Sequence, residues 1–385
     1  ARFGRALKAE DKMVFALLLS KLFGCDEELP ATNLSIEAIS EFIVNAFGDG
    51  FPWQGRGLND LSTVTANEIV ASHPLLLCSA PGHDVSGRID SMARKQSQEI
   101  SSVAMGSAEG FATAERMVMT ASKRGTWVLL KNCHLCTEWL ENTLVKKLQG
   151  LGSGANPNFR LFITSEISPK LPTSLLRLSD IIVAEAPSGI KASLTRFTSS
   201  ISSDRYNNPI RNRLYLLLGW THAVIQERLR YIPTGWSEAY EFTEADALHA
   251  LDAVDALLDD SSGGKQANDP EKLPWDAIRI TLCKGIFGGR ITKESDQQIL
   301  DNLVFGLFAP SCFDVNFRLV DADDAPSLPD GTSMNECLAW ISSLSEYTPP
   351  TWIGLDGSAE TTRSESIAKS VVTKVAKVEM IMSSE

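Results

Sequence analysis

The sequence predicts an α/β domain with a parallel sheet, followed by a region built from helices alone. Short apolar segments alternate with helix-length segments over about 110 residues, which is typical of a parallel sheet covered on both faces. After Pro187 the apolar residues instead recur at the spacing of amphipathic helices. The five predicted strands are 75–78, 100–105, 127–130, 159–164 and 181–183.

Helices are expected before the first strand and between the strands. The predicted helices are 13–22, 35–47, 60–72, 108–121 and 137–148. Thr137 is expected to cap the last of these, because its hydroxyl can accept a hydrogen bond from a first-turn amide. Since the chain begins inside a helical pattern, we expect it to be a piece of a longer protein.

The region after Pro187 is expected to be helical to its end. The predicted helices are 214–231, 242–258, 275–286, 295–308 and 364–382. Thr243, with Asp246 three residues later, gives the second of these a beginning that resembles a capping box. The acidic segment 321–331 contains proline and is expected to be a loop.

The composition excludes several classes of protein. With a net charge of −12, the 385-residue chain is not expected to bind nucleic acid or an anionic membrane. No apolar run approaches the roughly 18 residues that a membrane helix needs. Among the seven cysteines only Cys133 and Cys136 form a close pair, without the second pair that a zinc site requires. Free thiols are therefore favoured over a redox or metal site.

The stretch from Leu75 to Ile89 has the layout of a phosphate-binding loop, in which a strand, a glycine-bracketed loop and a helix follow one another. Gly82 and Gly87 have the required separation. The lysine position holds Arg88, which keeps the positive charge as a broader planar fork, and the hydroxyl position holds Ile89. Isoleucine has no oxygen for Mg²⁺. An ordinary strand-to-helix turn is the alternative reading.

Two further positions lack the residues that ATP hydrolysis needs. A P-loop ATPase carries acidic residues after a second strand, where they hold Mg²⁺ and orient water. Here Lys131 and Asn132 follow that strand, and neither serves this purpose. The next strand ends in Ser165 and Glu166, whose carboxylate would repel a polyphosphate. The positions agree in predicting a loop that does not bind Mg²⁺–ATP.

Other candidate residues carry weaker signals. Arg177 could reach the phosphate of a neighbouring subunit, although an ion pair with Asp180 is favoured. His222 lies one helical turn from Gln226 and is interpreted as a hydrogen-bonded core or groove histidine. The nearby charged residues are expected to form a solvated helix face, and they are Glu227, Arg228 and Arg230.

Longer segments carry a family likeness. In chain order they read PGHDVSGRID (81–90), GSAEGFATAERM (106–117), GTWVLLKNCHL (125–135) and NFRLFITSEISPKLPTSLLR (158–177). The run from Leu214 to Phe242 is more specific still, and PWDAIR and IFGGRIT follow it. Together these segments resemble the sixth and last AAA+ module of the dynein heavy chain family, in its cytoplasmic form.

The resemblance implies an AAA+ P-loop-type domain with a helical lid. Its implied divisions are a lead-in from the preceding module at 1–58, the α/β part at 59–190, the lid at 191–355 and a C-terminal helix at 356–385. It also implies neighbouring AAA+ modules of the same chain, other dynein subunits and, through a stalk elsewhere, microtubules as partners in the cytoplasm and cytoskeleton. ATP and Mg²⁺ would be bound by other modules, and no cofactor is expected here.

Three functions are compatible with these residues. The favoured one is a non-catalytic module that serves the motor ring structurally and mechanically during minus-end-directed movement. A second is a residual nucleotide-binding regulatory module, in which Arg88 and loop amides hold phosphates without a metal. The third is a role in trans, in which Arg177 serves as an arginine finger that reaches a phosphate bound by the adjoining module.

Overall fold

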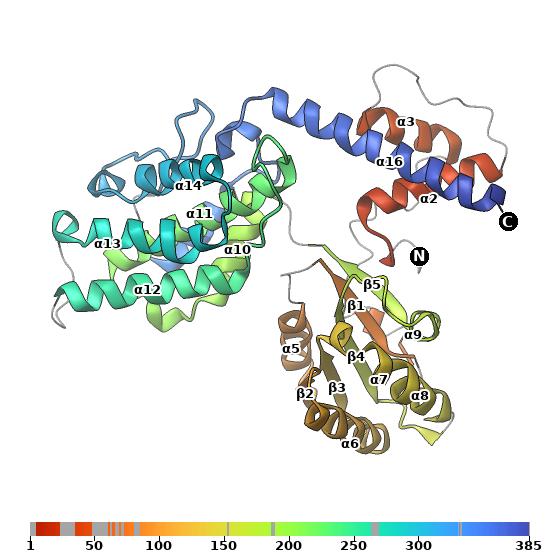
Figure 1. The fold of residues 1–385 in the computed structure, drawn as a ribbon. Coiled ribbons are helices and arrows are strands. Elements are labelled where there is room, and N and C mark those ends of the chain that lie inside the picture. The colour runs from red at the N-terminus through yellow and green to blue at the C-terminus, as the bar shows by residue number, and fades with distance from the viewer. Residues whose placement is uncertain are drawn as a thin grey trace. The chain divides into compact units, whose positions relative to one another are not determined.

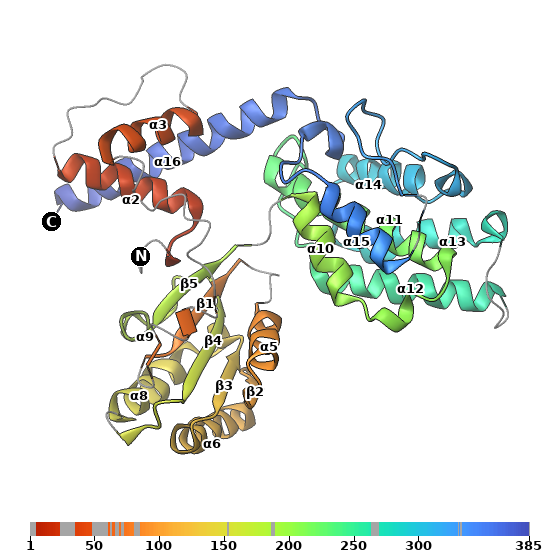
Figure 2. The ribbon, with the colours of Figure 1, turned by 180° about the vertical axis from the view of Figure 1, so that it is seen from behind.

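The computed structural model describes residues 5–23, 35–47, 61, 64–65, 69–70, 73–80, 85–151, 154–185, 189–262, 269–329, 331 and 333–384. The chain forms two compact units (Figures 1 and 2). The first comprises Ala1–Ala186 with Ile367–Glu385, and the second comprises Pro187–Ser366. No helix among the described residues is long and apolar enough to span a membrane.

The first unit contains a five-stranded parallel sheet with the order β2-β3-β4-β1-β5. The strands are β1 (Leu75–Ser79), β2 (Ile100–Ala104), β3 (Trp127–Lys131), β4 (Arg160–Glu166) and β5 (Asp180–Ala184). All five predicted strands are therefore confirmed. Because the strands are parallel, their carboxyl ends meet at one edge, where ligands bind in open α/β sheets.

Helices cover both faces of this sheet (Figures 1 and 2). They are α5 (Ser86–Lys95), α6 (Ala108–Arg124), α7 (Thr137–Trp139), a π-helical segment (Leu140–Val145), α8 (Lys146–Leu151) and α9 (Thr173–Leu178). Successive strand residues point to opposite faces. Leu129 accordingly packs in the core under α5, whereas Val128 and Leu130 pack in the core under α6 and α9.

Local hydrogen bonds explain where these helices begin and end. The Ser107 side chain caps α6 by accepting a hydrogen bond from the Gly110 amide, and Gly125 ends the helix at φ +84°, which glycine adopts without strain. The predicted capping role of Thr137 is wrong. The residue before α7 is Cys136, which makes no side-chain cap, and Thr137 already lies inside the helix.

Three further helices of the first unit pack on one another. They are α2 (Ala9–Leu22), α3 (Ile36–Phe47) and the second half of α16 (Ser358–Ser384). Leu17, Ile43 and Val371 belong to their shared apolar cluster. Lys374 on α16 forms ion pairs of 3.2 and 2.9 Å with two carboxylates in the first turn of α2. The predicted helix at 60–72 lies largely outside the described residues.

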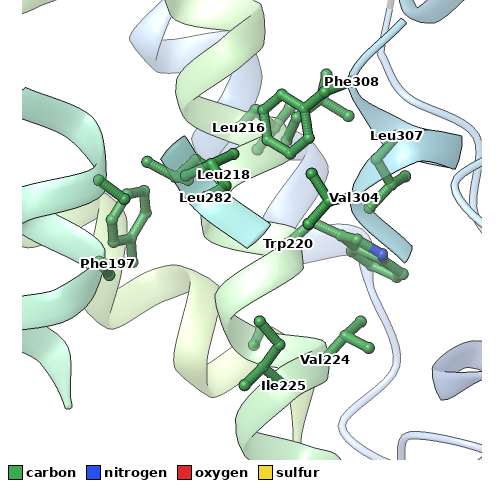
Figure 3. Packing of buried hydrophobic residues seen from close by; sticks show 14 of the residues in the cluster. Phe197, Leu216, Leu218, Trp220, Val224, Ile225, Leu282, Val304, Leu307 and Phe308 are labelled. Atoms are coloured by element: carbon green, nitrogen blue, oxygen red, sulfur yellow. The ribbon is translucent and has the colours of Figure 1, made fainter. Parts of the chain in front are cut away.

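The second unit is helical, as predicted. Its helices are α10 (Ile190–Ser200), α11 (Pro209–Arg228), α12 (Glu244–Ser262), α13 (Trp275–Ile280) with its π-helical continuation (Thr281–Ile286), α14 (Glu294–Leu307), α15 (Met334–Ser343) and the beginning of α16. Helix α11 is buried along most of its length and forms the centre of the core (Figure 3). Gly219 permits close packing with α10, because a Cβ there would lie 2.6 Å from the Phe197 ring.

The end of α11 departs from the sequence prediction. Glu227 and Arg228 are 4% and 6% exposed, so the predicted solvated helix face is wrong for these two residues, whereas Arg230 is exposed as predicted. The Glu227 carboxylate accepts hydrogen bonds from the Gly189 amide and the Arg230 side chain. The Arg228 guanidinium donates to the Gly235 carbonyl at 3.0 Å and to the Ile353 carbonyl. These partners make burial of the two charges possible.

Candidate functional site

The candidate site lies at the carboxyl edge of the sheet, where β1 ends and α5 begins (Figure 1). Gly82 falls outside the described residues. Gly87 and Arg88 are exposed in the first turn of α5, and a Cβ on Gly87 would meet no atom within 4 Å. Ile89, at the position of the metal-binding hydroxyl, is fully buried and packs in the core under α5. That position therefore serves packing.

An ion pair lies where β3 reaches this edge. Lys131 is the last residue of β3, and its Nζ atom is 3.7 Å from Oδ2 of Asp90 on α5. The two side chains are 29% and 30% exposed. An ammonium group has only hydrogen-bond donors, so Lys131 supplies no ligand to a metal ion. Its positive charge instead balances the only carboxylate of α5.

The turn after β3 makes a hydrogen bond to β4 beyond the last residue pair of the two strands. The last paired residues of these two strands are Leu130 and Ile163, so β4 extends beyond its neighbour. The backbone amide of Asn132 then donates a hydrogen bond to Oγ1 of Thr164 at 3.3 Å. Asn132 adopts the left-handed conformation with φ +59°, which asparagine tolerates better than most residues.

His134 holds the end of β4 by two contacts. Its Nδ1 atom accepts a hydrogen bond from the Glu166 amide at 3.2 Å, and its Nε2 atom lies 3.8 Å from Oε2 of the same residue. Because Nδ1 is an acceptor, the neutral imidazole carries its proton on Nε2, facing the carboxylate. Ser165 is buried and donates to the Glu166 carbonyl at 2.9 Å. Glu166 is thus held by its neighbours at this edge.

Sequence reasoning singled out Glu166 but missed His134. The two residues are 32 positions apart, and only the parallel pairing of β3 with β4 brings them together. A usable signal was present, because His134 comes four positions after the end of a predicted strand, at the same edge of the sheet.

Arg177 lies on α9, just before the amino end of β5, whereas Cys133 and Cys136 follow the carboxyl end of β3. Arg177 is exposed on α9, and within the described chain no hydrogen bond or ion pair joins it to Asp180. Cys133 and Cys136 are free and buried, and the thiol of Cys136 donates to the Cys133 carbonyl at 3.4 Å. Hydrogen bonding between the two thiols raises the pKa of Cys133 and lowers the pKa of Cys136.

His222 belongs to the second unit and is a core residue. It is 4% exposed, and its ring stacks on Phe287 at 6.1 Å between centroids. Burial lowers its pKa to about 4. The predicted hydrogen bond is not formed at Nδ1, which has no partner among the described residues, and Gln226 donates instead to the Phe242 carbonyl.

The described side chains at the sheet edge do not fit a complex of Mg²⁺ with a nucleotide. The hydroxyl position is a buried isoleucine, and the acidic position is a lysine already beside Asp90. Glu166 adds a negative charge at the end of β4, and a carboxylate near a polyphosphate would repel it. Nor do the described residues contain a cluster of three or more His, Cys, Asp or Glu that could hold a metal ion.

Comparison with known proteins gives two matching family models. Residues 70–183 match the dynein heavy chain region D6 P-loop domain, and residues 211–359 match the dynein heavy chain AAA lid domain. Cytoplasmic dynein heavy chains are similar over most of the chain. That of Dictyostelium discoideum is 40% identical over 94% of the chain, and that of Drosophila melanogaster is 39% identical over 98%. The aligned parts span 7% and 8% of those relatives.

Proposed function

Because the chain belongs to the dynein heavy chain family, we propose that it serves a dynein motor ring as a structural and mechanical AAA+ module without nucleotide chemistry of its own. It would be the sixth module, with the helical second unit as its lid. The parent motor would bind ATP and Mg²⁺ in other modules and move along microtubules toward their minus ends, in the cytoplasm. The partners of this module would be its neighbouring modules and other dynein subunits.

The observation that carries this proposal is the ion pair between Lys131 and Asp90. In an active module the end of this strand supplies a carboxylate to Mg²⁺. Here the same position presents an ammonium group, which repels a divalent cation and already has a counter-ion 3.7 Å away. The buried side chain of Ile89 removes a second ligand. The described strands nevertheless form a regular parallel sheet with helices on both faces, which favours a module retained for its packing.

Isothermal titration of the 385-residue chain with Mg²⁺–ATP tests the proposal. We expect no binding heat at millimolar nucleotide, whereas micromolar affinity would overturn it. A parallel titration of the chain with ATP in the presence of EDTA tests the alternative function, a module that binds nucleotide without a metal ion. In that case Arg88 and the helix amides of α5 would hold phosphates without a metal, and affinity would survive removal of Mg²⁺.

A role of Arg177 in a neighbouring module is a second candidate. Its side chain is exposed on α9, and no ion pair with Asp180 occupies it within the described chain. A guanidinium group that reaches an adjoining phosphate can stabilise the charge that develops during hydrolysis. Arg177→Ala in a full motor is then expected to lower its ATPase rate, and Arg177→Lys should not restore that rate fully. An unchanged rate in the alanine variant would remove this candidate.

A further inference from the structure

We propose that Lys131 is a specificity-determining residue whose ammonium group serves as a built-in cation, closing this sheet edge to divalent metal ions. Asp90 is its counter-ion. The inference rests on the proposed function, because it identifies what makes this module differ from one that binds Mg²⁺–ATP. The difference is chiefly due to the positive charge of Lys131.

The fold directs Lys131 toward α5. Along β3, Trp127 and Leu129 pack in the core under α5, and Val128 and Leu130 pack on the opposite face. Since side chains alternate along a strand, Lys131 falls on the same face as Trp127 and Leu129. Asp90 directly follows Ile89, which is buried in that same core. The pair is therefore a product of strand register and helix placement.

The charges at this edge give Lys131 its effect. Asp90 is the only acidic residue of α5, and it is the only described carboxylate within 4.0 Å of the Lys131 ammonium. Arg88 adds a second positive charge in the same turn of α5. Glu166, the last residue of β4, is held beside His134 and makes no ion pair with Lys131 among the described residues. A divalent cation that approached Asp90 would meet a resident positive charge, and like charges at such distances repel.

Changing the sign of the charge at this position is then expected to open a metal site. A glutamate side chain is one bond shorter than lysine, so Lys131→Glu would place a carboxylate oxygen about 5 Å from Oδ2 of Asp90. Two oxygens so placed can share a cation, because oxygen–metal bonds are about 2.1–2.6 Å long. Lys131→Met, whose side chain reaches about as far as that of glutamate but carries neither a charge nor an oxygen ligand, is the matched control.

The experiment measures Mn²⁺ binding to the 385-residue chain by electron paramagnetic resonance of the free ion. We expect Lys131→Glu to bind one Mn²⁺ at least about ten-fold more tightly than either the native chain or Lys131→Met. Adding Asp90→Asn should abolish the gain, because it removes one of the two carboxylate ligands. A Lys131→Glu variant that binds no better than Lys131→Met would overturn the inference. A gain that survives Asp90→Asn would do so as well.

Two additions keep the test decisive. Circular dichroism shows whether Lys131→Glu folds. If it does not, Lys131→Gln supplies a neutral oxygen ligand, and we expect it to bind Mn²⁺ more tightly than Lys131→Met; equal binding would overturn the inference. The native chain is titrated separately with Mg²⁺–ATP, and tight binding there would contradict the proposed function. Failure of the variants to gain Mn²⁺ would contradict only the assignment to Lys131.

Discussion

Replacing His222 with phenylalanine is expected to remove a pH-dependent loss of stability from the helical unit. His222 is buried on α11, its ring stacks on Phe287, and its Nδ1 atom has no hydrogen-bond partner among the described residues. Burial lowers its pKa from the ordinary 6.5 to about 4, against an opposing attraction from Asp246 and with a smaller lowering by Arg196. Phenylalanine can fill the same space and keep the ring contact without a titratable group.

The sign and size of the effect follow from proton binding in the two states. Between pH 6.5 and pH 4 the unfolded chain binds a proton at His222 and the folded chain does not, so folding loses stability as the pH falls through this window. At 1.36 kcal/mol for each pKa unit, His222 lowers the free energy of unfolding by about 2 kcal/mol between pH 7.5 and pH 5. Above pH 6.5 it has almost no effect.

Urea unfolding of the native chain and of His222→Phe at the two pH values measures this difference. The buried Trp220 and Trp236 report on the helical unit through their fluorescence. We expect the native transition to move by about 1 M urea more than that of the variant, for a slope near 2 kcal/mol/M. Other histidines contribute equally to both proteins and cancel. Equal shifts in the two proteins would refute the reasoning.

Two further substitutions test the packing of the same unit. Arg228→Met is expected to lower the free energy of unfolding by about 3 kcal/mol, because it leaves the buried carbonyls of Gly235 and Ile353 without their donor; Arg228→Lys, measured in the same urea series, should restore only part of the loss. Gly219→Ala is expected to cost about 1–3 kcal/mol, since the added Cβ would lie 2.6 Å from the Phe197 ring. A Gly219→Ala transition identical to the native one would show that α10 and α11 adjust freely.

The sheet and most helices were predictable because their signals are local. Buried parallel strands read as continuous apolar runs, and Leu75 to Cys78 is such a run. The beginning of α12 was predictable for a similar reason. Asp246 accepts a hydrogen bond from the Thr243 amide at 2.7 Å, and the Asp246 amide donates to Oγ1 of Thr243 at 3.3 Å. Both partners of this capping box lie within four residues.

The missed features depend on contacts between distant parts of the chain. The sequence marked Lys131 as the wrong residue for a metal, but only the fold brings it to Asp90. Glu227 is a charged residue, and its sequence neighbours predict exposure. It is nevertheless buried, because the Gly189 amide, 38 residues away, donates a hydrogen bond to its carboxylate. Helices α10 and α15 were not predicted. Ser333 caps α15 in a full capping box with Glu336, a local signal that the sequence interpretation overlooked.

The most direct test of the central claim is an experimental structure of the 385-residue chain, determined in excess Mg²⁺–ATP. The account predicts no density for phosphate or metal at the carboxyl edge of the sheet, and it predicts Lys131 beside Asp90 as described here. Density for a nucleotide next to Arg88, with Lys131 turned away from Asp90, would contradict it.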